Sequence, residues 1–143
     1  MNDYVVGDYG GILKQLSFSK KKRLASNKQF EAILARKLRV ADELLVLYAA
    51  ENDCGYPRLG VSVGKSCGAA VRRNRLKRLL REAFRQSQDR ISPNFDYLLM
   101  ISPQLSKKLN KQISSKKAAG QPTFEQVKAS FLALAAAIVG KTG

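Results

Sequence analysis

Residues 69 to 85 constrain the fold of this chain more than any other segment. The segment reads AAVRRNRLKRLLREAFR and carries seven basic residues but one acid, Glu82. At about 100° per residue, the apolar and the basic residues separate onto opposite sides of a helix. We predict a helix that packs against a core through its leucines and exposes a row of cations. The apolar side carries Leu76, Leu79, Leu80, Ala83 and Phe84, and the opposite side carries Asn74, Lys77, Arg78, Arg81 and Arg85.

The charge on this helix is unusual because nearly all of it has one sign. Exposed helix faces commonly mix signs, and like charges four residues apart cost a few tenths of a kcal/mol. The whole chain shows the same bias, with 26 Lys and Arg against 11 Asp and Glu and a net charge of +15. A compact basic domain is typical of proteins that bind polyanions. A solvated face remains the ordinary alternative, but we predict that this face binds nucleic-acid phosphates, with an anionic membrane surface as the second candidate.

Few residues could carry catalysis or hold a metal ion. The chain has no histidine, which excludes histidine acid–base catalysis and histidine metal sites. Its acids are scattered along the sequence, so a carboxylate metal cluster would need long-range folding to form. Cys54 and Cys67 are too few for a disulfide framework and are predicted to be reduced thiols. We therefore predict no catalytic residue and no metal ligand in the protein.

Nothing in the sequence indicates a membrane segment or a secreted protein. No stretch approaches 18 consecutive apolar residues, and the N-terminus lacks the apolar region of a signal peptide. We expect a cytoplasmic protein without a membrane partner. A length of 143 residues suggests one domain with a sizeable core. We place this domain at 18–140, after a flexible tail at 1–17, with a lysine-rich loop inserted at 106–122.

Capping patterns and short apolar runs predict the remaining elements. Ser26 with Gln29, and Thr123 with Gln126, are capping-box patterns that begin helices. Three apolar runs bounded by turn residues are predicted strands. The order helix, strand, strand, basic helix, strand, helix indicates one α/β or α+β domain around a small sheet. The predicted helices are 27–37, 69–85 and 124–139, and the predicted strands are 44–50, 57–64 and 95–102.

The basic segment also carries a family resemblance. RNRLKRLLREAFR (73–85), preceded by PRLGVSVGKSCGAAV (57–71), closely resembles the signature of the bacterial ribonuclease P protein component. The resemblance continues upstream through KRLASNKQFEAIL (22–34) and VADELLVLYAA (40–50). It implies an α+β fold, an α/β sandwich similar to a domain of a ribosomal protein. In that fold helices pack a small central sheet, and a left-handed βαβ crossover presents the basic helix.

The resemblance also implies partners and a function. The main partner is a large catalytic RNA that, with Mg²⁺, removes the 5′ leader of precursor tRNA by endonucleolytic hydrolysis. The protein would be a subunit of this nuclease, with no cofactor of its own and no DNA partner. A ribosomal-type or RNA-chaperone protein remains the alternative, and a protein that is itself a metal-dependent nuclease is a second one. The spacing of the Arg-Asn-Arg motif favours the first hypothesis.

Two groups of site residues follow from the resemblance. The basic helix lies against the catalytic RNA in this family, and a cleft between the first helix and the sheet holds the single-stranded leader. Leu34 occupies a cleft position where many members have an aromatic residue. Core packing remains the alternative for Phe30 and Tyr48. The implied RNA-binding residues are Lys65, Arg72, Arg73, Asn74, Arg75, Lys77, Arg78, Arg81 and Arg85, and the implied cleft residues are Phe30, Leu34, Val46 and Tyr48.

Overall fold

The computed structural model describes residues 18–112 and 121–142 of the chain. The predicted tail at 1–17 lies outside the described residues, as does most of the second half of the predicted loop. The described residues form four strands, four α-helices and three short 3₁₀ helices, labelled η. In chain order these are η1 (Lys20–Lys22), α2 (Asn27–Ala35), β1 (Leu38–Ala41), β2 (Leu45–Glu51), β3 (Arg58–Ser62), η2 (Lys65–Cys67), α3 (Ala70–Ser87), η3 (Gln88–Arg90), β4 (Phe95–Ile101), α4 (Pro103–Gln112) and α5 (Phe124–Thr142).

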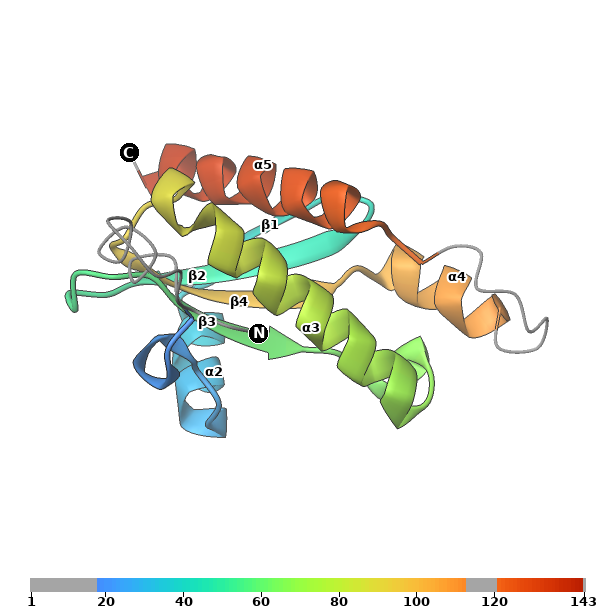
Figure 1. Cartoon of the computed structure of the whole chain (residues 1–143). Coiled ribbons are helices and arrows are strands. Elements are labelled where there is room, and N and C mark those ends of the chain that lie inside the picture. Colours follow the sequence, from blue (N-terminus) through green and yellow to red (C-terminus); the bar gives the residue numbers. More distant parts are fainter. Residues whose placement is uncertain (1–17, 113–120, 143) are drawn as a thin grey trace, which may run out of the picture.

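The four strands form one mixed sheet in the order β1-β2-β4-β3. β1 with β2 and β2 with β4 are antiparallel, whereas β3 and β4 are parallel and are joined through α3. This β3–α3–β4 unit is the predicted crossover that carries the basic helix. Helices α3 and α5 cover one face of the sheet, and α2 packs on the other face (Figure 1). The predicted α+β fold, with helices packed on a small sheet, is confirmed.

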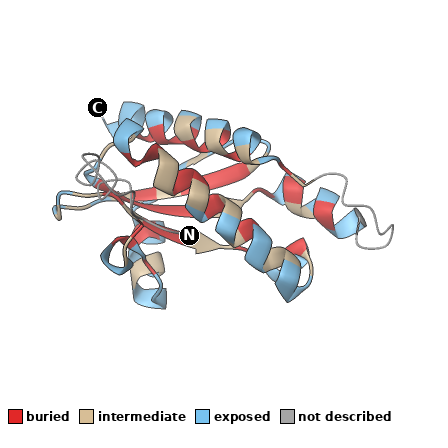
Figure 2. Ribbon diagram, viewed as in Figure 1, coloured by how far each residue is buried: buried red, intermediate tan, exposed pale blue. Residues whose placement is uncertain are grey.

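The predicted division of α3 into two sides is also confirmed. Leu76, Leu80, Ala83 and Phe84 are buried and Leu79 is half-buried. Figure 2 shows the buried stripe of α3 turned toward α5 and the sheet, with the exposed stripe on its outer side. The leucine side therefore fixes the helix in place, and the outer side is left to the cations.

Aromatic rings form the centre of the main core. The ring of Phe84 lies 5.3 Å from Phe18, 6.5 Å from Tyr97 and 6.0 Å from Phe131, measured between centroids. These rings come from the chain before η1, from β4 and from α5, so Phe84 joins three separate parts of the fold to α3. Tilted and edge-on pairs of this kind add to the stabilisation from buried area alone.

The opposite face of the sheet carries a smaller apolar cluster beneath α2. Leu24, Ile33 and Leu98 form its buried part, and Phe30 and Tyr48 pack against them. A Cβ atom added to Gly60 would lie 2.5 Å from the Phe30 ring, so the close approach of α2 to β3 requires glycine at this position. The predicted capping box holds the start of α2, because the Ser26 hydroxyl accepts from the Gln29 backbone and the Gln29 side chain accepts from the Ser26 backbone.

Two elements differ from the prediction. β1 was not predicted, and it forms an edge strand of four residues beside β2. The predicted loop at 106–122 is wrong in its first part, because α4 spans Pro103–Gln112. Buried Leu105 and Leu109 fix α4, and Ser102 Oγ accepts a hydrogen bond from the Leu105 N–H at its start. Pro103 follows shortly after the end of β4 and is the first residue of α4, a position in a helix where proline is well tolerated.

The other boundaries differ by a few residues. The helix predicted at 27–37 ends at Ala35, and Lys37 takes a positive φ of 57° just beyond it. The strand predicted at 57–64 is five residues long, and the last helix continues to Thr142. These are the usual errors of pattern-based boundaries, since ends of elements are set by packing and capping.

Candidate nucleic-acid interface

The outer face of α3 presents most of the predicted RNA-binding residues to solvent. Asn74, Arg75, Arg78 and Arg81 are exposed, and Lys65 is exposed in η2, directly before the helix. The helical repeat places the exposed residues of α3 on one side of the helix and its buried apolar residues on the opposite side. This arrangement leaves several guanidinium groups available on a rigid element, and guanidinium groups are suited to paired phosphate oxygens.

The remaining four predicted residues are half-buried, and two of them have partners within the protein. Arg72 Nη1 donates to the backbone oxygen of Leu109 at 3.0 Å, which ties the start of α3 to α4. Arg85 forms a double hydrogen bond with Glu82, at 2.7 and 3.0 Å. Hydrogen bonds from Arg85 and Gln86 hold the pKa of Glu82 below its ordinary value. Arg85 is therefore partly neutralised, whereas Arg73 and Lys77 have no ion pair among the residues the structure describes.

A residue outside the predicted set extends the basic face of α3. Arg23, after η1, places its guanidinium 4.8 Å from the centre of the Phe18 ring, and that ring packs on Phe84 of α3. Burial and the nearby Arg23 charge lower the pKa of Arg81. The basic segment at the start of the domain thus lies beside the middle of α3. The lysine-rich sequence of this segment indicated that it could bind RNA. The sequence did not indicate that the segment would lie beside α3.

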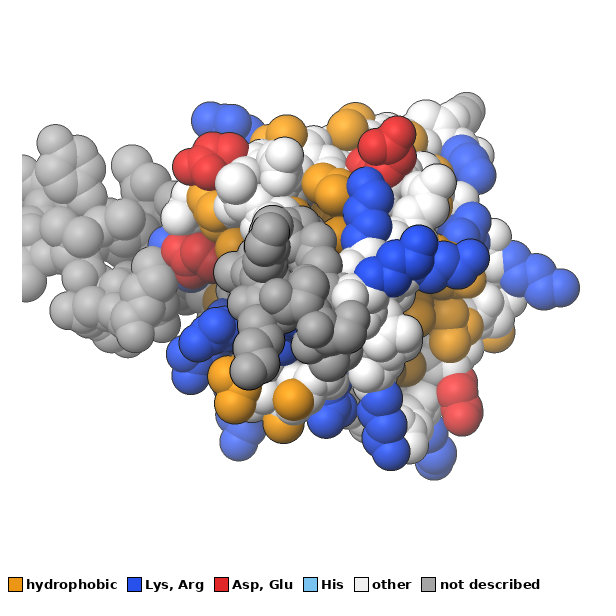
Figure 3. Space-filling view, turned by 90° about the vertical axis from the view of Figure 1, so that its right-hand side faces the viewer, with side chains coloured by type: hydrophobic (Ala, Val, Ile, Leu, Met, Phe, Trp, Pro, Cys, Tyr) orange, Lys and Arg blue, Asp and Glu red, His pale blue; other side chains and the backbone are white. Residues whose placement is uncertain are grey.

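Helix α4 adds further cations at the start of α3. Lys107 and Lys108 are exposed on α4, and α4 packs against η2, where Cys67 Sγ lies 3.4 Å from Ser106 Oγ. Figure 3 views this end of the molecule and shows Lys and Arg side chains spread over it, with acidic side chains sparse. The described part of the lysine-rich segment therefore widens the basic surface around the beginning of α3.

The four predicted cleft residues lie on or beside the face of the sheet that α2 covers. Tyr48 is half-buried, and the guanidinium of Arg39 on the neighbouring strand lies 6.0 Å from its ring centre. Phe30 is half-buried over Gly60, so its ring also anchors α2. Leu34 is 39% exposed, whereas Val46 is 6% exposed and offers little surface to a ligand. Tyr48 is thus the predicted residue whose ring is aromatic, partly accessible and beside a cation.

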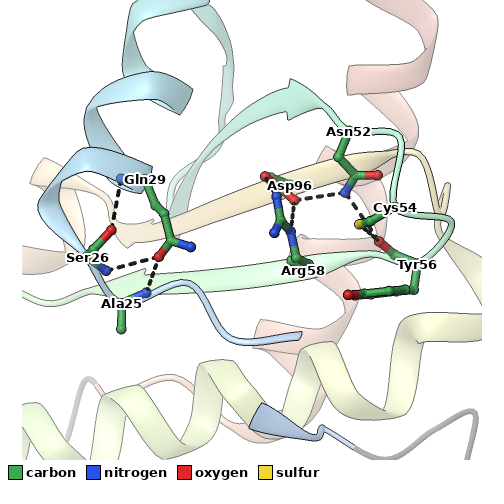
Figure 4. A network of polar contacts seen from close by, with 8 residues as sticks. All are labelled: Ala25, Ser26, Gln29, Asn52, Cys54, Tyr56, Arg58 and Asp96. Carbon is green, nitrogen blue, oxygen red and sulfur yellow. Dashed lines mark hydrogen bonds and ion pairs between the residues drawn. The ribbon is translucent and has the colours of Figure 1, made fainter. Parts of the chain in front are cut away.

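A pocket opens on the same side of the molecule, between α2 and one end of the sheet. A double hydrogen bond joins Arg58 to Asp96 at 2.6 and 2.7 Å, and Asn52 Nδ2 also donates to Asp96 (Figure 4). The hydrogen bonds to Asp96 raise the pKa of Arg58. The sequence did not reveal this pair, although a single carboxylate inside an apolar strand is a signal that a partner is needed.

The part of the chain that the structure describes holds neither a helix suited to a membrane nor a cluster suited to a metal ion. No helix there has the length and apolar character to cross a membrane. Across 18–112 and 121–142, no three acidic or cysteine side chains gather in a way that could hold a metal ion.

Comparison with known proteins connects this basic α+β domain to one family. A sequence model named Ribonuclease P matches residues 18–120. A ribonuclease P protein component of Clostridium botulinum is 36% identical over 97 residues, which cover 67% of this chain and 87% of that protein. One from Pseudomonas syringae pv. tomato is 47% identical over 74 residues, which cover 50% of this chain and 56% of that protein.

Solved structures show the same likeness in three dimensions. The ribonuclease P protein of Thermotoga maritima superposes with a TM-score of 0.65 at 29% identity, covering 79% of this chain and 94% of that one. The ribonuclease P protein of Staphylococcus aureus gives a TM-score of 0.62 at 28% identity, covering 79% and 91%. The matched residues include both the Arg-Asn-Arg helix and the sheet with α2. The chain belongs to the family of bacterial ribonuclease P protein components, whose role lies in tRNA 5′ processing.

Proposed function

We propose that this chain is the protein subunit of a ribonuclease P holoenzyme and has two RNA-binding surfaces. The basic face of α3 binds the catalytic RNA, and the face of the sheet beside α2 binds the 5′ leader of precursor tRNA. The RNA and its Mg²⁺ ions carry out the hydrolysis. The protein raises the affinity for substrate and offsets the repulsion between two polyanions.

The observation that carries this proposal is the one-sided charge of α3. Leu80 and Phe84 are fully buried on one side, while Arg75 and Arg78 are exposed on the other. Like charges spaced in this way destabilise a free helix, so a phosphate partner is the physical reason to keep them. A ribosomal-type or RNA-chaperone protein would also need such a face, and membership of the ribonuclease P family favours the processing role over both.

The leader-binding surface rests on Tyr48 and its surroundings. Single-stranded RNA of variable sequence is held well by stacking of its bases on aromatic rings beside cations. Tyr48 offers a half-buried ring, and Arg39 supplies the neighbouring cation. Both lie on a sheet, which fixes their positions before RNA binds.

Replacing Tyr48 with leucine tests this surface. Leucine keeps much of the apolar volume but loses the aromatic plane, so affinity for precursor tRNA should fall by about 1–3 kcal/mol. Affinity for mature tRNA, which has no leader, should hardly change. The measurement is equilibrium binding of both tRNAs to the reconstituted holoenzyme, and the readout is the ratio of the two dissociation constants.

The matched control is Tyr56→Leu, the same substitution in the turn between β2 and β3. This control should leave the ratio unchanged, even if it alters stability slightly. A Tyr48→Leu protein that loses affinity for both tRNAs equally would contradict the leader-binding assignment. The role of α3 would survive that result because it depends on other residues.

A further inference from the structure

Helix α4 carries positive charge that the proposed function does not use. Lys107 and Lys108 are exposed on it, and its ten residues contain no acid. Among the residues that the structure describes, neither of these lysines forms an ion pair. Lys107 and Lys111 are four residues apart, a spacing at which like charges destabilise a helix. A negatively charged partner would remove this cost.

The apolar side of α4 is already used inside the protein. Leu105 and Leu109 are buried and belong to the main core. At about 100° per residue, Lys107 lies opposite both leucines and Lys108 lies on the flank of the helix. Helices that bind a membrane surface insert an apolar side into it, and α4 has none to offer. Its exposed side can meet a partner only through charged and polar groups.

Arg72 fixes the end of α4 to the start of α3. Its Nη1 atom donates to the backbone oxygen of Leu109 at 3.0 Å. Leu109 is one of the last four residues of α4, and carbonyl groups at this end of a helix have no partner within it. A positive charge is also favoured there by the helix dipole. The guanidinium of Arg72 is therefore engaged within the protein, at a place that holds α4 in position.

The turn before α3 leaves room for this contact. Gly68 has a φ of 120°, and a Cβ atom added to it would lie 3.0 Å from Cδ of Arg72. A larger residue would strain the backbone and press on the Arg72 side chain. Cys67, in η2, provides a second contact, because its Sγ lies 3.4 Å from Ser106 Oγ on α4. α4 is thus fixed both to η2 and to the first turn of α3.

The exposed cations of α4 consequently continue the basic face of α3 beyond its first turn. Lys65 is exposed in η2, and Arg75 is exposed near the start of α3. Figure 1 shows α4 beyond the end of β4, and Figure 3 shows Lys and Arg side chains gathered at this end of the molecule. Because α4 is held in place by the fold, a partner that meets the start of α3 can also meet α4 without having to order it.

The chemistry of these side chains selects the phosphate backbone as the group they bind. A lysine ammonium is a compact charge with three donors and no acceptor. Contacts from such groups to phosphates position a protein on a nucleic acid without reading its sequence. The two exposed lysines of α4 therefore suit a polyanion that already lies against α3, whatever its bases are.

We propose that α4 is a second element that binds the catalytic RNA. Lys107 and Lys108 contact phosphates next to the RNA segment that the start of α3 binds. Arg72 is a positioning residue, which holds α4 against α3 and does not itself contact RNA. This proposal rests on the proposed function, because it takes the catalytic RNA to be the partner of α3, and it adds a contact outside that helix.

Joint replacement of Lys107 and Lys108 by glutamine tests the RNA contact. Binding of the whole chain to the catalytic RNA is measured over a range of salt concentrations. The affinity should fall by about 2- to 30-fold, the range expected when two exposed ion pairs are lost. The slope of log K against log salt should become shallower by about 0.7 to 0.9 for each lysine.

The matched control removes the same charge from another part of the surface. Lys28→Gln combined with Arg90→Gln changes exposed residues of α2 and η3, and η3 lies at the other end of α3 from η2. This control should retain the affinity and the slope of the unsubstituted protein. All four replaced residues are exposed, so the melting temperatures should change little, and they are measured for both double variants.

Arg72→Gln separates the positioning role from an RNA contact. A residue that binds phosphate itself would lower the affinity by the same factor whether or not Lys107 and Lys108 are present, whereas a positioning residue acts through them. Arg72→Gln alone should therefore weaken binding by no more than the lysine pair does. In the Lys107→Gln, Lys108→Gln protein it should cause no further loss. Amide hydrogen exchange should become faster in α4 of the Arg72→Gln protein but not in α5.

Three results would overturn the role of α4. The lysine variant could keep the full affinity and slope, or the control could lose as much as the lysine variant does. In the third, the lysine variant keeps its RNA affinity but loses binding to anionic phospholipid vesicles that the unsubstituted protein shows, which would make a membrane the partner. An additive loss from Arg72→Gln would overturn its positioning role. Failure of the proposed function differs from all of these, since the unsubstituted protein would then bind the catalytic RNA no better than an unrelated RNA of equal length.

Discussion

Replacing Phe84 with alanine is expected to lower the free energy of unfolding by about 3–5 kcal/mol. The side chain is fully buried, and the rings of Phe18, Tyr97 and Phe131 surround it. Its removal leaves a cavity where three parts of the fold meet α3, and such a site has little room to collapse. Urea denaturation followed by circular dichroism measures the loss.

Phe124→Ala provides a matched control on α5. Phe124 is half-buried and packs at the edge of the same core, so its loss should cost clearly less. If Phe84→Ala and Phe124→Ala destabilise the protein equally, Phe84 is not the residue that docks α3. The assignment of the leucine side as the packed side would then need revision.

Replacing Arg78 and Arg81 together with alanine is expected to weaken binding to the catalytic RNA by about 100-fold or more, because each loses one charge-assisted contact worth about 1.5–3 kcal/mol. Both residues are exposed, so the free energy of unfolding should hardly change. The slope of log K against log salt should also become shallower, by about 0.7 to 0.9 for each lost phosphate contact. Filter binding or fluorescence anisotropy over a range of salt concentrations gives both quantities.

The control for this pair removes two positive charges elsewhere. Lys28 and Arg90 are exposed on α2 and η3, away from the outer face of α3, and their joint replacement by alanine gives the same net charge. The control should retain most of the affinity and the slope. An unchanged slope for the Arg78 and Arg81 variant, or an equal loss in the control, would mean that bulk charge rather than this face binds RNA.

The features that were predictable from the sequence depend on local order. In α3 the leucines recur at helical spacing and the arginines occupy the gaps, so one segment of 18 residues specifies both its packed and its exposed side. The Ser26–Gln29 capping box is equally local, since its two members are three residues apart. Composition alone could not distinguish between several classes of RNA-binding protein. The family resemblance predicted which RNA this helix binds.

The features that were missed depend on contacts between distant segments. β1 is four residues long with alternating half-buried positions, and it becomes a strand because β2 lies beside it. α4 looked like a lysine-rich loop, because its only apolar anchors are Leu105 and Leu109, which pack near η2. Short elements with weak patterns take their structure from their neighbours.

The same limit applies to the candidate sites. Arg58 and Asp96 are 38 positions apart, and only the parallel pairing of β3 with β4 places them opposite each other. Arg23 and Arg81 are brought near by the packing of Phe18 on Phe84. The sequence could therefore name the basic helix as a binding surface, but it could not show the pocket or the extension of the basic face.

The proposed division of labour predicts how cleavage depends on Mg²⁺. Precursor tRNA is incubated with the protein, with the catalytic RNA and with both, while the Mg²⁺ concentration is lowered in steps. The protein without RNA should cleave nothing, and the RNA without protein should lose activity as Mg²⁺ falls. The two together should still cleave at the correct 5′ end, because the cations of the protein offset phosphate repulsion that Mg²⁺ no longer screens. Cleavage by the protein without RNA, or no gain from adding it at low Mg²⁺, would contradict its role as an accessory subunit.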